Sequence, residues 1–265
     1  MKRFVASILL IPLLLCSTSC TRLGRTELDS FLSSDGKEIL EDLYGFDSYS
    51  MTYTTVMYNS SAEKYVTFEI KTVFERKTSL TFSEIKLDGE TNVSFFIKGK
   101  TIYYETLLGK EQKTKGDLSG IKDFLAFTDV KARLGAIALP LSLSEGQLSS
   151  LKAKVRLTKE SEASHYAFSF GEKYFRYAVS NTNGVFDSVL DGEIEASDVK
   201  VNDYEITYSL DKDGVLEALT DYNSFSVRKN GKRLNYESLV IIKEYHATLQ
   251  FNEDGYKDPS VGEYM

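Results

Sequence analysis

Residues 49–75 read YSMTYTTVMYNSSAEKYVTFEIKTVFE, and this stretch decides the fold class. In its first half, apolar or aromatic side chains occupy alternate positions, namely Tyr49, Met51, Tyr53 and Met57. The second half repeats the alternation with Val66, Phe68, Ile70 and Phe74. A period of two is typical of antiparallel strands that bury one face. The polar run NSSAE between the halves supplies a turn, so the stretch predicts a β-hairpin.

The same alternation continues through most of the chain. Further strands are expected at 79–87, 93–106, 154–160, 164–180, 203–227 and 237–252. Gly171 and the pair Asp213-Gly214 are interpreted as hairpin turns. The pattern predicts a mainly β protein of the α+β type. We expect a large curved antiparallel sheet or half-barrel with a few helices packed on one face.

Two regions have helical spacing instead. In residues 34–45, Ser34 or Asp35 is placed to cap a helix, and Gly45 ends it. This region predicts one short amphipathic helix that packs on the sheet. A helical insert of two or three short helices is expected near 117–153. Within it, Ser144 is followed three residues later by Gln147, which fits a capping box.

The start of the chain has the pattern of a secretory signal. Met1, Lys2 and Arg3 precede an apolar run over 4–15, which is too short for a comfortable membrane span. The small residues at 17–19 lead to Cys20 and resemble the lipobox of bacterial lipoproteins, although that motif usually has Leu where Ser17 stands. The resemblance implies a signal peptide over 1–19 and acyl chains such as palmitate on Cys20.

Two alternatives to this interpretation remain open at this stage. Cys16 is the rival anchor, although the bulky Leu15 precedes it, and an ordinary secretory peptide needs neither cysteine. With Cys20 as the anchor, residues 20–33 form the lipidated anchor and a tether. Residues 34–252 are then a single β-rich domain, and 253–265 an acidic, poorly packed tail.

Composition limits the partners of the mature chain. Loss of Lys2 and Arg3 from the 32 basic residues leaves 30 against 39 acidic ones, a net charge of −9. So acidic a chain has no electrostatic footprint for nucleic acid. With Cys16 removed and Cys20 acylated, no disulfide is expected, so the core alone must stabilise an exported protein.

Motifs for catalysis or metal binding are lacking in the sequence. Its two histidines, His165 and His246, lie in strand-like runs, and no G-x-S-x-G motif accompanies them. Two distant histidines do not make a zinc site. The run DKDG at 211–214 begins like a calcium loop, but the twelfth position is Tyr222. We therefore expect no catalytic residue, no metal site and no cofactor.

The layout of anchor, N-terminal helix, long strands, helical insert and further strands is similar to that of the LolA/LolB and LppX-type lipid-carrier lipoproteins. This resemblance covers most of residues 34–252 and involves no specific motif. It implies one curved sheet around helices, and binding of an acyl chain or another apolar ligand. Residues that could line such a cavity are Met51, Tyr53, Met57, Phe68, Phe95, Tyr103 and Tyr208. The same residues also fit a plain sheet core.

Three functions follow in order of preference. The first is non-catalytic binding of a lipid or other apolar ligand by a lipid-anchored protein that faces outside the cytoplasm. Its membrane is the cell membrane, or the outer membrane in a two-membrane bacterium. The second is a protein–protein interaction module of the cell envelope with no small ligand. An envelope hydrolase comes last, because no titratable groups converge in the sequence.

Overall fold

A computed structural model describes residues 19–59, 64–117, 130–181, 198–229 and 232–257. Within these residues, twelve antiparallel strands form one sheet. The strands of the first part are β1 (Ser19–Arg22), β2 (Ser48–Asn59), β3 (Lys64–Glu75), β4 (Leu80–Leu87), β5 (Glu90–Lys98), β6 (Thr101–Leu107) and β7 (Lys110–Asp117). Those of the second part are β8 (Lys154–Lys159), β9 (Ala163–Ser169), β10 (Val199–Asp211), β11 (Leu216–Lys229) and β12 (Lys232–Glu244).

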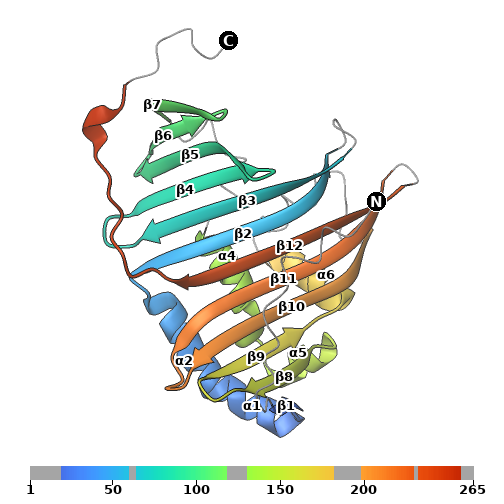
Figure 1. Cartoon of the computed structure of the whole chain (residues 1–265). Helices are drawn as coiled ribbons and strands as arrows, with labels where there is room; N and C mark the ends of the chain where they lie inside the picture. The colour runs from blue at the N-terminus through green and yellow to red at the C-terminus, as the bar shows by residue number, and fades with distance from the viewer. Residues whose placement is uncertain (1–18, 60–63, 118–129, 182–197, 230–231, 258–265) are drawn as a thin grey trace.

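The order across the sheet is β1-β8-β9-β10-β11-β12-β2-β3-β4-β5-β6-β7. Strands β2 to β7 therefore form one meander. Strands β8 to β12 form a second, with β1 added beside β8, and β12 pairs with β2 to join the two. The sheet curves, and its end strands β1 and β7 do not meet (Figure 1). The expected fold class, a large curved antiparallel sheet with a few helices, is confirmed.

Helices gather on one face of this sheet (Figure 1). They are α1 (Arg25–Ser33), α2 (Asp35–Gly45), α4 (Val130–Ala138), η3 (Leu139–Ser142), α5 (Glu145–Ser150) and α6 (Glu172–Asn181). The sheet face toward them is called the inner face here, and the opposite one the outer face. The closest helix–strand packing places α6 on β10, and α2 and α4 on β11. One continuous apolar core joins these helices to the inner face.

Several local predictions are confirmed. The hairpin of residues 49–75 is β2 paired with β3, where Tyr53 faces Ile70 across the strands. The expected helix at 34–45 is α2, which buries Ile39 and Leu43. In α5 the Ser144 hydroxyl accepts a hydrogen bond from the Gln147 amide, and the Gln147 side chain accepts one from the Ser144 amide, as the capping box predicts.

The expected strand over 164–180 is wrong in its second half. Strand β9 ends at Ser169, and after Gly171 the chain forms α6 rather than the return strand of a hairpin. Tyr174, Phe175 and Ala178 are the buried residues of this helix. Their spacing of one and four residues puts them on one helical face, which a strand would split between its two faces.

The segment expected as a tether is folded. Residues 19–22 form β1, which pairs with β8 at one end of the sheet. Helix α1 follows directly and buries Leu28, Phe31 and Leu32 in the core. The apolar spacing of 28, 31 and 32 is that of a helix with one buried stripe. Cys20 itself is exposed.

The C-terminal segment packs on the outer face of β4 to β6. Phe251 and Tyr256 contact the ring of Tyr103, with centroids 4.9 and 5.2 Å apart, and Phe96 lies beside Phe251 at 4.8 Å. Lys257 also pairs with Thr114 of β7 in an isolated parallel bridge. The expected poorly packed tail is therefore packed as far as residue 257. Residues 258–265 lie outside the described part.

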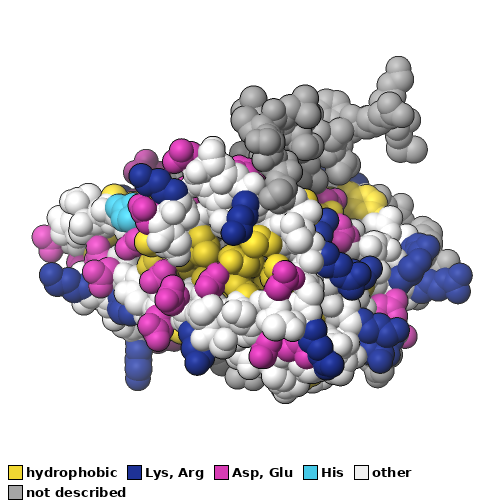
Figure 2. Space-filling model, turned by 90° about the horizontal axis from the view of Figure 1, so that it is seen from below, with side chains coloured by type: hydrophobic (Ala, Val, Ile, Leu, Met, Phe, Trp, Pro, Cys, Tyr) yellow, Lys and Arg dark blue, Asp and Glu magenta, His cyan; other side chains and the backbone are white. Residues whose placement is uncertain are grey.

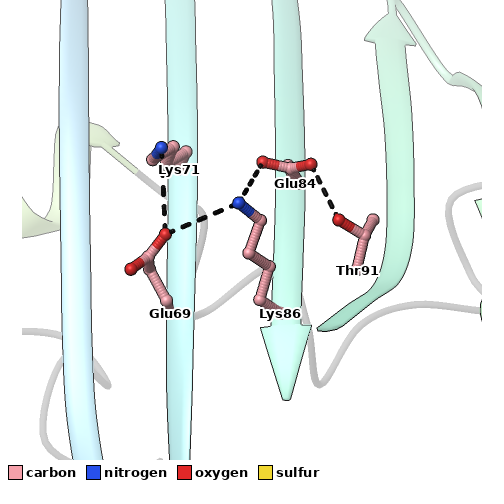
Figure 3. A network of polar contacts seen from close by, with 5 residues as sticks. All are labelled: Glu69, Lys71, Glu84, Lys86 and Thr91. Carbon is pink, nitrogen blue, oxygen red and sulfur yellow. Dashed lines mark hydrogen bonds and ion pairs between the residues drawn. The ribbon is translucent and has the colours of Figure 1, made fainter. Parts of the chain in front are cut away.

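Elsewhere the outer face of the meander β3–β5 is polar. Glu69, Lys71, Glu84, Lys86 and Thr91 form a network of ion pairs and one hydrogen bond between neighbouring strands (Figure 3). The charged pairs are 3.5 to 3.9 Å apart and partly exposed. Solvated pairs of this kind contribute little to stability, so this network marks a surface face.

The described helices are all too short or too polar to cross a membrane.

Candidate functional site

The inner face is built from rows of side chains that run across the strands. The pairing of β9 to β5 aligns Phe168, Ile206, Asp221, Val240, Tyr53, Ile70, Ile85 and Val93 in one row. A neighbouring row contains Tyr208, Leu219, Ile242, Met51, Thr72, Ser83 and Phe95. Because residues at alternate positions share a face, the rows give the sheet a mainly apolar inner wall.

The structure brings together four of the seven residues predicted to line a cavity. Met51, Tyr53, Phe95 and Tyr208 are at most 1% exposed and belong to the single large core. Phe68 is only partly buried and lies opposite Thr55 of β2. The side chain of Met57 lies outside the described part of the chain.

Tyr103 is on the other side of the sheet. It packs with Leu80 and Phe96 in a separate outer cluster, covered by the C-terminal segment. The sequence places Tyr103 and Tyr104 side by side, and consecutive strand residues point to opposite faces. Of the two, Tyr104 packs against the inner core, which the alternation alone did not reveal.

Tyr208 connects the sheet to α4. Its hydroxyl donates a hydrogen bond of 2.6 Å to the carbonyl of Ile137, in the last turn of that helix. Carbonyls in the last turn of a helix have no partner within the helix, so this bond satisfies one of them. Burial raises the pKa of Tyr208 well above its ordinary value. Tyr208 therefore has a structural role in the core.

A polar cluster interrupts the apolar inner wall. Arg133 of α4 is 3% exposed, and its guanidinium carbon lies 4.6 Å from the centroid of the Tyr53 ring. Asp221 of β11 is 1% exposed, accepts a hydrogen bond from Asn223, and interacts electrostatically with Arg133. Asn223 in turn accepts a bond of 2.8 Å from the Ser238 hydroxyl. We call Arg133, Asp221, Asn223, Ser238 and Tyr174 the buried polar cluster.

Burial dominates the ionisation of this cluster. It raises the pKa of Asp221 to about 6, although the positive charge of Arg133 and the hydrogen bond from Asn223 act in the opposite direction. Burial also raises the pKa of Tyr174 well above its ordinary value, and the nearby Asp221 carboxylate adds to the shift. A carboxyl group in so dry a place changes its charge close to neutral pH.

Four polar atoms of the cluster have no hydrogen-bond partner in the described part of the chain. They are Nε and Nη2 of Arg133, Oδ1 of Asp221 and the Tyr174 hydroxyl. Folded proteins leave few buried polar groups unpaired, because each one costs about 1–3 kcal/mol. A cluster with several such atoms is the most unusual chemistry in the described structure.

Sequence reasoning missed this cluster, although the sequence contains a signal for it. In the strand 216–229 the inward positions are Leu219, Asp221, Asn223 and Phe225, so an acid and an amide stand where apolar residues are expected. Arg133 likewise precedes the apolar run LGAIALPL. A charged residue on an apolar stripe, matched by an acid on an apolar strand face, indicates a buried pair.

In the described part of the chain, the two histidines have few polar partners. His165 Nδ1 lies 2.9 Å from the Ser209 hydroxyl, and its Nε2 is 4.0 Å from Glu160. Ser209 sits inside β10, paired with β9 and β11 on either side, so the surrounding amides belong to the sheet and form no oxyanion hole. His246 is largely exposed beside Glu244. Neither arrangement resembles a nucleophilic site.

One surface groove lies between α1 and strands β8 and β9. Its volume is about 400 Å³, and its lining includes Leu23, Phe31, Leu157 and Tyr166 together with Glu27 and Asp35. The Tyr166 hydroxyl donates a hydrogen bond of 2.7 Å to Asp35. Figure 2 views the molecule from the end where α1, β1 and β8 lie, and it shows apolar side chains exposed between charged ones.

Metal-binding chemistry is not evident in the described residues. No group of three or more His, Cys, Asp or Glu side chains among them lies close enough together to hold an ion.

In comparisons with solved structures, the chain is similar to the lipoprotein LppX of Mycobacterium tuberculosis, with 13% identity and a TM-score of 0.39. That match covers 85% of this chain and 100% of LppX. The chain is also similar to LprF from Mycobacterium bovis, with 11% identity, a TM-score of 0.32, and coverage of 83% and 95% respectively. No protein-family model matches the sequence, and no curated protein matches it. The architecture given above rests on the strand pairing of this chain.

Proposed function

We propose that this protein is a lipid-anchored, extracytoplasmic lipoprotein that binds a lipid or another apolar ligand without catalysis. The inner wall of the curved sheet supports this proposal. Its apolar rows run from β9 to β5, whereas the closest helix packing among the described residues is on β10 and β11. In the described part of the chain, the wall therefore continues beyond β10 and β11 to Met51, Ile70, Ile85 and Phe95, which are buried in the same core.

The proposed ligand lies along this extended wall with its hydrocarbon against the inner rows. Burial of apolar surface contributes about 25 cal/mol per Å², so a long acyl chain would be held firmly by such a wall. The unclosed sheet leaves the two end strands apart, so the wall is not sealed into a barrel by strand pairing. Ligand pockets are generally apolar with few polar groups, and this wall has that composition.

Native mass spectrometry tests the ligand. The sample is residues 19–265 with Cys20→Ser, which retains every described strand and helix, purified from a bacterial host without detergent. We expect a bound mass in the lipid range that is lost after organic extraction and regained on adding lipid. A protein that carries no lipid and takes up none of the added lipid would refute this function.

Metabolic labelling tests the anchor separately. The full chain is expressed in bacteria with radiolabelled palmitate, alongside Cys20→Ser and the matched control Cys16→Ser. We expect label in the unmodified chain and in Cys16→Ser, and none in Cys20→Ser. Two acyl chains hold a protein on a membrane far more firmly than one, so Cys20→Ser should also release the protein from the membrane fraction. Equal labelling of all three proteins would exclude Cys20 as the anchor.

The second candidate is an interaction module of the cell envelope. The groove between α1, β8 and β9 favours it, because Leu23 and Leu157 in its lining are partly exposed, and apolar side chains on this end of the molecule lie among charged ones (Figure 2). Cross-linking in intact cells, with photoreactive residues at Leu157 and at the control position Leu108, tests it. A single cross-linked protein at Leu157 that is absent at Leu108 is the expected result for this candidate.

A further inference from the structure

The two unpaired nitrogens of Arg133 lie on the same edge of its guanidinium group. Nε and Nη2 each carry an N–H, and together they form a flat fork with two parallel donors. This fork matches two oxygens of one carboxylate or phosphate, which is the arrangement that gives arginine its strong bidentate bonds. The free edge is therefore shaped for an anionic group with two oxygens.

Apolar side chains surround the buried polar cluster. The guanidinium stacks over the Tyr53 ring, and the cross-strand neighbours of Asp221 are Ile206 and Val240. All these side chains are at most 3% exposed. An anion free in water would gain little by entering such a place, because it would lose its hydration. An anion attached to a hydrocarbon chain gains the apolar contacts of the wall at the same time.

The Tyr174 hydroxyl adds a third donor. It is buried, unpaired among the described residues, and carried by α6, on the same inner side as Arg133. Its ring packs against Phe170 and Tyr204, with centroids 3.7 and 5.6 Å away, which fixes the position of the hydroxyl oxygen. The cluster thus offers three donors that have no acceptor among the described residues, near the unpaired Oδ1 of Asp221.

We propose that the free edge of Arg133, with the Tyr174 hydroxyl, binds the head group of an anionic single-chain amphiphile, a carboxylate or a phosphate monoester. This inference rests on the proposed function, because the hydrocarbon chain lies along the apolar wall described there. Asp221 is the counter-charge of Arg133 in this structure. When it is ionised, it repels the incoming anion and lowers the affinity.

Calorimetric titration of residues 19–265 with Cys20→Ser tests the proposal. Three probes share a sixteen-carbon chain, namely hexadecanoate, monohexadecyl phosphate and the neutral hexadecanol. We expect at least one of the two anions to bind about tenfold or more tightly than hexadecanol, because a charged hydrogen bond is worth that much or more. The ratio between the two anions distinguishes a fatty acid site from a phosphate site.

Variants assign the preference to the cluster. Arg133→Met should weaken binding of the preferred anion at least about tenfold and leave hexadecanol within about twofold. Arg133→Lys keeps the charge without the fork and should give an intermediate affinity. Asp221→Asn removes the like charge and should strengthen anion binding at pH 7.5. Arg156→Met, at an exposed arginine that pairs with Glu205 at 2.6 Å, is the matched control and should change nothing.

The outcomes separate the two proposals. If the unchanged protein binds hexadecanol as tightly as both anions, the head-group site is refuted and the binding of apolar ligands stands. If it binds none of the three probes, the proposed function fails and the head-group site fails with it. The preference of the unchanged protein needs no variant, so it decides the question even if Arg133→Met does not fold.

Discussion

The ionisation of Asp221 makes a strong prediction about stability. Its pKa is about 6 in the folded protein against an ordinary value of 3.8, because burial disfavours the charged form. The folded state therefore holds this proton more tightly than the unfolded state. Protonated Asp221 therefore contributes to the free energy of unfolding. This contribution is fully present below pH 3.8 and is lost as pH rises through about 6. Each unit of pKa difference corresponds to about 1.4 kcal/mol, so the whole effect is about 3 kcal/mol.

Urea unfolding measures this contribution. Between pH 5 and pH 7.5, linkage with these two values gives a loss of about 1.4 kcal/mol from Asp221 alone. Asp221→Asn has nearly the same shape and no proton to release, so its stability should lack this loss. The titratable groups of the described residues that interact with Asp221, which are Arg133, Tyr174, Tyr204 and Tyr208, are present in both proteins.

The difference between the two proteins is the readout. The free energy of unfolding of the unchanged protein should fall, relative to Asp221→Asn, by about 1.4 kcal/mol over this range. Asp254→Asn, at an exposed acid of the C-terminal segment, is the control. Its free energy of unfolding should change with pH in parallel with that of the unchanged protein. Parallel curves for Asp221→Asn and the unchanged protein would show that Asp221 is not a buried acid, and the reasoning would fail.

Three further changes test the packing, each by urea unfolding. Tyr208→Phe removes the hydrogen bond to the Ile137 carbonyl and should cost about 1–3 kcal/mol, because that buried carbonyl loses its donor; no change would mean that the carbonyl finds another partner. Phe251→Ala removes the ring that covers Phe96 and should cost about 2 kcal/mol, less than a fully buried Phe, and should increase binding of an apolar dye; unchanged dye binding would contradict the covering role. Ser144→Ala removes the cap of α5 and should cost about 1 kcal/mol, whereas Ser144→Asn should restore it.

The sequence predicted the sheet because its strands are long and only half buried. The alternation of Tyr53 and Ile70 with polar neighbours specifies both the strand and the buried face. The same reasoning failed at Tyr174 and Phe175, where two adjacent apolar residues suit either a strand or a helix. It failed again at Tyr103, because a pair of tyrosines does not say which one points inward.

The site was harder to predict than the fold for a physical reason. Arg133 and Asp221 are 88 positions apart in the chain and meet only after α4 packs against β11. Local patterns show that each is unusual for its position, but the pairing arises from tertiary packing. The candidate residues chosen from the sequence were apolar, so the polar chemistry of the inner wall was not among them.

The pairing of β12 with β2 has a consequence for the order of folding. Within each meander, neighbouring strands are consecutive strands of the sequence, whereas the pairing of β12 with β2 joins Ile242 to Met51. Contacts between distant parts of a chain form slowly, since a long loop must close first. Until residues 237–244 are synthesised, β2 keeps an unpaired edge, and open edges promote aggregation. The last described strand thus completes the middle of the sheet, and a chain cut short before it would expose that edge permanently.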